Sequence, residues 1–258
     1  MSPINSIITA QSVSYHQYAS DTQWYVALQP NKNVTFKTIS QCTDDVNWWF
    51  LENKLLLNPS KTELTEAMLC GTREQCNNVN KSSGVVLEGT VFKFSDYIKL
   101  LGVKLDPAII VNRHVTELMR SCNSHIRALR HINPLLTLKS TKMVALGIVT
   151  AHLDYCNSFL YDTSSDNLRK LQVTQNALAR VVCQAARTCS ATELRHTLHW
   201  LPMKQRINYK LTVLTYKARQ SGSQSYLASL ISDYVPSCSL RSSDKLLLSR
   251  SYMSLCHG

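Results

Sequence analysis

Residues 106–132 read DPAIIVNRHVTELMRSCNSHIRALRHI. The apolar side chains of this stretch recur at the three- and four-residue spacing of one helical face, directly after the turn signal Asp106-Pro107. They are Val111, Val115, Leu118, Met119, Cys122, Ile126 and Leu129. We therefore predict an amphipathic helix after Pro107, with one side packed against a protein core.

Three arginines, Arg113, Arg120 and Arg127, recur every seven residues along the same stretch and are called the arginine row below. At ideal helical geometry each lies about 200° around the axis from the apolar position two residues later. Guanidinium groups opposite a core-facing row are what a helix needs to follow a phosphate backbone. A solvated helix face has the same pattern, so the row supports both interpretations equally.

The helical period continues towards the C-terminus. We expect further helices over residues 140–159, 167–186, 191–198 and 204–220. Trp200 precedes Pro202, and we expect its ring to be packed rather than to act with His199 in catalysis or stacking. From Tyr234 the sequence is Ser-rich and poorly periodic, which predicts a loose tail.

The N-terminal side of the chain is mixed. Residues 13–17 and 22–28 are β-branched and aromatic runs around a polar tetrapeptide, which predicts a β-hairpin. A helix is expected over residues 39–53, before the breaking sequence at 58–60. Strands are expected over residues 61–70, 85–87, 91–94 and 98–105. The predicted fold class is α+β, with domains at 1–106 and 107–233 and a tail at 234–258.

Charge divides the chain at the same place. Residues 1–106 carry 9 Lys and Arg against 10 Asp and Glu, whereas residues 107–258 carry 19 against 7. The net charges of these two parts are therefore −1 and +12. A basic surface favours polyanions, because each neutralised phosphate releases condensed counterions. The asymmetry favours nucleic acid as the partner, and a merely solubilising basic surface is the alternative.

Composition excludes several classes of protein. Hydrophobic residues make up 44% of the chain and charged residues 17%, which is typical of a globular protein. No stretch approaches the roughly 20 apolar residues of a membrane span, and we expect neither a membrane partner nor a secretory signal. The nine cysteines have irregular spacings without a zinc-knuckle pair, so we expect free thiols. The predicted location is intracellular, in the cytoplasm or nucleus.

Residues 18–26 (YASDTQWYV) resemble the Y-A-D-D-T-Q-L-Y-V segment of non-LTR retrotransposon reverse transcriptases. Further blocks follow in the same order. Trp48-Trp49 with residues 55–63 (LLLNPSKTE) looks like the late palm motif, and residues 100–106 (LLGVKLD) look like the primer-grip strand. Four later blocks resemble the stretch that follows the palm in jockey-like elements. They are residues 153–157 (LDYCN), 171–177 (LQVTQNA), 198–202 (LHWLP) and 240–243 (LRSS). The ordered blocks cover nearly the whole chain.

The resemblance implies a truncated palm followed by a mainly helical, thumb-like domain, and an RNA-directed DNA polymerase that uses Mg²⁺. Asp21 matches the second carboxylate of the family's metal-binding pair, but Ser20 stands where the first is expected. Lys61 matches a position suggested to protonate pyrophosphate, while Tyr18 and Gly102 match positions near the nucleic acid. The family's upstream Asp block has no counterpart in the 17 residues before Tyr18. We therefore expect a chain that is catalytically inactive alone.

The expected partner is RNA or an RNA–DNA primer–template, contacted by Tyr18, Gly102 and the arginine row. Self-association is also expected, through apolar surface left exposed on the truncated palm. Two alternatives stay open: a binding module without catalysis, and a transposon-derived fossil with no selected activity.

Overall fold

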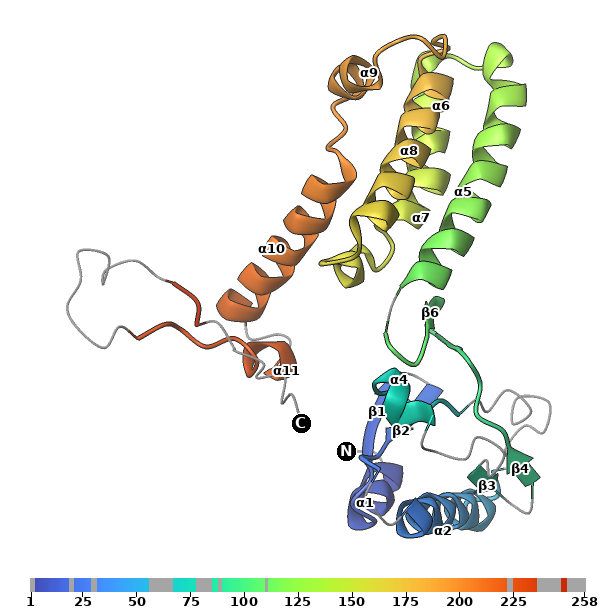
Figure 1. The fold of residues 1–258 in the computed structure, drawn as a ribbon, viewed down its shortest axis with the longest axis vertical. Helices are drawn as coiled ribbons and strands as arrows, with labels where there is room; N and C mark the ends of the chain where they lie inside the picture. Colours follow the sequence, from blue (N-terminus) through green and yellow to red (C-terminus); the bar gives the residue numbers. More distant parts are fainter. Residues whose placement is uncertain are drawn as a thin grey trace. The chain divides into compact units, whose positions relative to one another are not determined.

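The structure is a computed structural model that describes residues 3–18, 21–28, 32–55, 67–77, 85–87, 90–109, 111–221, 225–235 and 247–249 (Figure 1). The described part is mixed α and β and mostly helical, with three two-stranded antiparallel sheets. At this level the predicted fold class is confirmed. The chain divides into two compact units, Met1–His114 and Val115–Gly258.

The first unit opens with two helices around a hairpin. The elements are α1 (Pro3–Ala10), β1 (Ser14–Tyr18), β2 (Asp21–Tyr25) and α2 (Lys32–Glu52). Their core consists of the buried residues Ile8, Val13, Cys42 and Val46, with Trp24 and Phe50 packed against it. The hairpin is confirmed, with Tyr18 opposite Asp21 in register. Helix α2 begins seven residues before the helix predicted over residues 39–53.

The remaining strands of this unit form two small hairpins. They follow the short helix α4 (Arg73–Asn77) and comprise β3 (Val85–Leu87), β4 (Thr90–Phe92), β5 (Ile98–Leu100) and β6 (Val103–Leu105). Of the strand predicted over 61–70, residues 61–66 lie outside the described part, and Ala67 makes only an isolated bridge to Phe94.

The single strand predicted over residues 98–105 is wrong, because the chain turns back at Leu101-Gly102. Leu100 pairs with Val103 across this two-residue turn. Both turn residues have positive φ, 45° at Leu101 and 84° at Gly102, as a type I′ hairpin turn requires. Gly102 therefore lies at the tip of a hairpin rather than within a strand.

The second unit is helical. Its elements are α5 (Asn112–Ile132, which begins in the first unit), η2 (Asn133–Leu135), α6 (Leu138–Ala145), η3 (Leu146–Thr150), α7 (Ala151–Asp154), η4 (Asn157–Leu160), α8 (Ser165–Val182), α9 (Ala191–Leu198), α10 (Met203–Ser221) and α11 (Ser225–Ala228). Hydroxyl groups cap two of the helices: the Thr137 side chain accepts from the Ser140 amide, and the Ser164 side chain accepts from the Asn167 amide.

Helix α8 is the centre of this unit, since it packs against α6, α9 and α10 (Figure 1). Its side chains Leu171, Leu178 and Ala179 are fully buried. The helices predicted over 191–198 and 204–220 are confirmed, and that over 167–186 ends earlier, at Val182.

The continuous helix predicted over 140–159 is wrong. Helix α6 gives way to the π-helix η3, and the chain then forms the short helix α7 and the 3₁₀ turn η4. Cys156, in the left-handed conformation with φ of 50°, ends the helical run before η4. Of the predicted tail, residues 236–246 and 250–258 lie outside the described part. Asp233 and Leu248 pair in an antiparallel bridge.

Candidate nucleic-acid interface

Helix α5 has the two faces that its sequence predicts. Val115, Cys122, Ile126 and Leu129 are buried along one side. Arg120 and Arg127 are exposed on the other side, and neither forms an ion pair with any described residue. A seven-residue interval of α-helix advances about 10.5 Å, so the two guanidinium groups project from the same face two turns apart. Their charge is therefore available to an anionic partner.

The third member of the arginine row has a local partner. The Arg113 guanidinium lies over the Tyr97 ring, 4.3 Å from its centroid, and the Lys104 ammonium lies 4.7 Å from the same centroid. Tyr97 thus joins the β5–β6 hairpin to the first turn of α5 through two cation–π contacts. Tyr97 was missed in the sequence because nothing in the chain order indicates that two cations meet its ring.

The structure describes only some of the residues that were expected to serve catalysis or to contact nucleic acid near the hairpin. Ser20 and Lys61 lie outside the described residues, and of Asp21 only the backbone is described, as the first residue of β2. Tyr18 is exposed at the end of β1 and Gly102 is exposed at its hairpin tip. No group of three His, Cys, Asp or Glu side chains able to hold a metal occurs within the part of the chain that the structure describes.

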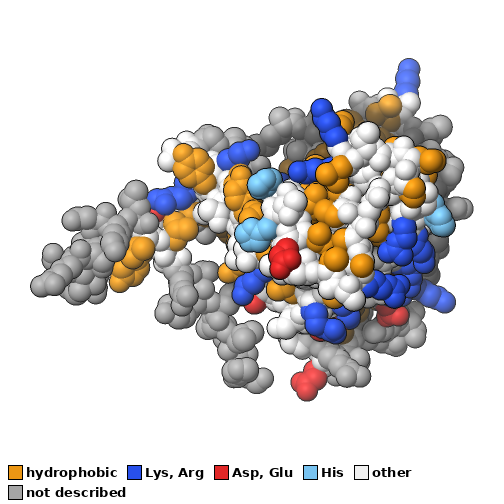
Figure 2. Space-filling model, turned by 90° about the horizontal axis from the view of Figure 1, so that it is seen from above, with side chains coloured by type: hydrophobic (Ala, Val, Ile, Leu, Met, Phe, Trp, Pro, Cys, Tyr) orange, Lys and Arg blue, Asp and Glu red, His pale blue; other side chains and the backbone are white. Residues whose placement is uncertain are grey.

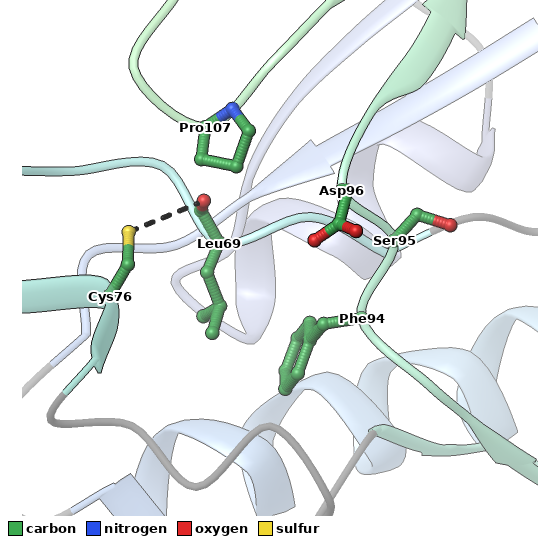
Figure 3. Close-up of a pocket in the computed structure, with 6 residues that line it drawn as sticks. All are labelled: Leu69, Cys76, Phe94, Ser95, Asp96 and Pro107. Atoms are coloured by element: carbon green, nitrogen blue, oxygen red, sulfur yellow. Dashed lines mark hydrogen bonds between the residues drawn. The ribbon is translucent and has the colours of Figure 1, made fainter. Parts of the chain in front are cut away.

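A pocket lies in the first unit, and none of the residues expected to serve the function lines it (Figure 3). It is lined by Leu69, Cys76, Phe94, Ser95, Asp96 and Pro107. The Cys76 thiol donates to the Leu69 carbonyl oxygen at 3.7 Å, so the thiol is engaged in holding two segments together. We assign the pocket to local packing.

Polar residues of the block 171–177 connect helices α8 and α10. The side-chain amide of Gln172 donates through Nε2 to Gln175 and Asn176 along α8, and its side-chain oxygen Oε1 accepts from the Met203 amide at 2.9 Å. Gln175 in turn donates to the Leu201 carbonyl oxygen at 2.9 Å. We call Gln172, Gln175 and Asn176 the amide cluster. It fixes the start of α10 on α8.

Two charged groups extend this polar framework. Arg195 of α9 is buried and donates to Asn176 and to Thr192. Arg206 of α10 pairs with Asp154 of α7 through two contacts, one of them at 2.8 Å. Asp154 and the three residues of the amide cluster, which belong to these blocks, therefore have structural roles. Trp200, buried beside them, is packed as predicted.

Basic side chains outnumber acidic ones in residues 107–258, by 19 to 7. Figure 2 shows more Lys and Arg than Asp and Glu on the face that it presents. Among the described acidic residues, Asp154, Asp166 and Asp233 are engaged with arginines of the same unit. The excess positive charge of residues 107–258 is thus left largely to solvent or to an anionic partner.

None of the helices in the described part of the chain is both long and apolar enough to cross a bilayer. Comparisons of the chain with models of protein families, with curated proteins and with solved structures find no match.

Proposed function

We propose that this chain is part of the reverse transcriptase of a non-LTR retrotransposon, and that it binds RNA or an RNA–DNA primer–template without polymerising DNA by itself. The ordered sequence blocks from residue 18 to residue 243 support the origin. The order of the elements supports it too. A late palm and thumb would have a hairpin, as at residues 14–25, followed by a helix, small hairpins and a helical basic unit.

The observation that carries the binding proposal is the exposed side of α5. Arg120 and Arg127 project from one face, opposite residues that are fully buried. Guanidinium groups bind phosphate oxygens bidentately, so two of them on a rigid helix make a defined phosphate contact. The surrounding unit contributes a further excess of positive charge.

The proposal of inactivity follows from the donor set at the hairpin. Two-metal nucleotidyl transfer needs several carboxylates around Mg²⁺, a hard cation that prefers charged oxygen ligands. Ser20 and Asp21 together supply one carboxylate. This pair does not fit a productive two-metal site, and Lys61 then has no positioned pyrophosphate to protonate.

The test is the affinity of the whole chain for an RNA–DNA primer–template across a salt series, with primer extension in Mg²⁺ on the same sample. We expect binding that weakens with salt and no extension. Replacing both Arg120 and Arg127 by Ala should reduce the slope of log K against log salt by about one unit for each phosphate contact that is lost.

A matched control removes the same charge elsewhere on the second unit. Arg169 is exposed and paired with Asp166, and Arg187 is exposed on the segment after α8. The Arg169→Ala/Arg187→Ala variant should bind nearly as the wild type does. Equal losses in both double variants would show a diffuse charge effect and reject the α5 interface, and extension by the wild type would overturn the proposed inactivity.

A further inference from the structure

Helix α10 carries an exposed aromatic and basic surface, which is a different surface from the arginine row of α5. Met203, Ile207 and Ala218 are buried along one side of the helix. Tyr209 and Tyr216 lie seven residues apart on roughly the opposite side. Their side chains are 65% and 63% exposed, so two large aromatic rings face solvent from one helical face.

The charges on this helix all have one sign. Met203–Ser221 contains Lys204, Arg206, Lys210, Lys217 and Arg219 and no acidic residue. Arg206 and Arg219 are paired with Asp154 and Asp233. A lysine follows each tyrosine directly, so the dipeptide Tyr-Lys occurs twice at the same helical phase. Lys204 and Lys210 are exposed and form no ion pair with a described residue.

We propose that Tyr209 and Tyr216, with Lys210 and Lys217 beside them, form a site for an unpaired segment of nucleic acid, called the tyrosine face below. Exposed aromatic rings interleaved with lysines are the combination that single strands recognise, because bases stack on the rings while phosphates meet the cations. A duplex has no free base faces to offer such rings. The site therefore distinguishes single strands from duplex.

The spacing of the tyrosines fits this occupant. Seven helical residues separate the two rings by about 10.5 Å along the axis. Stacked bases lie about 3.4 Å apart, so three stacking intervals come to about the same distance. Two unpaired bases therefore fit between Tyr209 and Tyr216, each stacked on one ring and on the other base. An acidic protein segment would explain the lysines but not the repeated ring spacing.

This surface is separate from the α5 arginines and does not depend on the polymerase origin of the chain. The experiment is anisotropy of a labelled single-stranded oligothymidine of twelve nucleotides, titrated with the full chain and competed with unlabelled duplex and with polyglutamate. The variants are Tyr209→Ala/Tyr216→Ala and Tyr209→Phe/Tyr216→Phe. The matched control is Tyr161→Ala/Tyr226→Ala, which removes two tyrosines exposed elsewhere on the same unit.

We expect the alanine pair to weaken single-strand binding by about tenfold or more, since stacking on an aromatic ring is lost for two bases. The phenylalanine pair should retain the affinity, because the rings remain. Duplex binding should be the same in all the tyrosine variants. A loss confined to duplex in Arg120→Ala/Arg127→Ala would report on the α5 interface alone.

Three results would overturn the tyrosine face. The alanine pair could bind the single strand as the wild type does, or the control pair could lose as much affinity. Polyglutamate that displaces the oligonucleotide as efficiently as unlabelled single strand would show that the face recognises negative charge without bases. Circular dichroism of each variant verifies that α10 is intact.

Discussion

Asn133 joins three helical segments through one small side chain. Its amide donates to the Val181 carbonyl oxygen at the end of α8, and its side-chain oxygen accepts from the Thr141 hydroxyl of α6 at 2.7 Å. Asn133 and Thr141 are both buried, so the Thr141 hydroxyl depends on Asn133 for its hydrogen bond.

Asn133→Ala should lower the free energy of unfolding by about 1–3 kcal/mol, because the buried Thr141 hydroxyl loses its hydrogen bond and the Val181 carbonyl oxygen keeps the one from the Gln184 amide. Chemical denaturation of the purified chain measures this. Asn123→Ala, an exposed position of α5, is the control and should stay within about 0.5 kcal/mol of the wild type. A loss below about 1 kcal/mol at Asn133 would contradict the role assigned to it.

The thiols differ in reactivity for a physical reason. Burial raises the pKa of Cys122 to about 11, and burial together with the Asp45 carboxylate raises the pKa of Cys42 to about 11. At pH 8 their thiolate fraction is on the order of 10⁻³, against roughly a quarter for an ordinary thiol of pKa 8.5. Alkylation at pH 8 with mass-spectrometric mapping should modify the exposed Cys156 and Cys189 before the buried Cys42 and Cys122.

The same shift makes stability depend on pH. The pKa of Cys122 is higher in the folded than in the unfolded chain. The contribution of this thiol to the free energy of unfolding is therefore complete below about pH 9 and is lost as pH rises towards 11. Cys122→Ala should reduce that alkaline loss. Labelling of Cys122 as fast as Cys156 in native protein would show that α5 opens on the time scale of the reaction.

At the scale of elements, the turn between β5 and β6 places a non-glycine residue in the left-handed backbone region. Leu101 has φ of 45°, a region that costs about 1–2 kcal/mol for a residue that carries a Cβ atom. Type I′ turns strongly prefer Asn-Gly at these two positions.

Leu101→Asn should raise the free energy of unfolding by about 1 kcal/mol, and Gly102→Ala should lower it by at least as much, because Gly102 needs φ of 84°. Thermal melting of both variants tests the pair. If Leu101→Asn were less stable than the wild type, the exposed Leu101 side chain would have a packing role that outweighs the strain.

The elements that the sequence predicts best are helices with a sustained apolar period. Residues 191–198 and 204–220 match α9 and α10 almost to the residue, because local spacing alone determines the buried face. The β5–β6 turn was missed because Leu-Gly lacks the usual turn composition. The break at η3 was missed because residues 146–150 keep an apolar composition through the change of helical period.

At the scale of the whole molecule, several large apolar side chains of the first unit are exposed. Trp48, Leu51 and Leu55 are exposed near the end of α2, and Tyr18 and Tyr25 are exposed on the hairpin. Among the described residues, β1 and β2 pair only with each other, so each has an open edge. Such edges and patches favour association with a second chain.

Size-exclusion chromatography with light scattering should therefore show a dimer or larger species at micromolar concentration. Trp48→Glu/Leu51→Lys should shift the chain towards monomer without loss of helix signal. Asn123→Lys, an exposed position on α5, is the control and should leave the distribution unchanged. A wild-type chain that stays monomeric at high concentration would remove the basis for association.

Charge was the whole-molecule property most accessible from sequence, since composition alone shows that residues 107–258 are basic. The arginine row was likewise predictable from spacing, and α5 places Arg120 and Arg127 on an exposed face. The amide cluster was not, because Gln172 and Gln175 bind backbone groups of residues 201 and 203, which only folding brings close. The role of Ser20, Asp21 and Lys61 stays a prediction.

The π-helix η3 has a consequence for how related chains would have to be aligned. Its final hydrogen bond spans five residues, from the Ala151 amide to the Leu146 carbonyl oxygen, so the turn holds one residue more than an α-helical turn. Removing one residue here would restore an α-helical turn and rotate everything after it by about 100°. Leu153 would leave the core and Asp154 would lose Arg206. A homologue with a single-residue gap at 146–150 would therefore need a different partner for the residue at the position of Arg206.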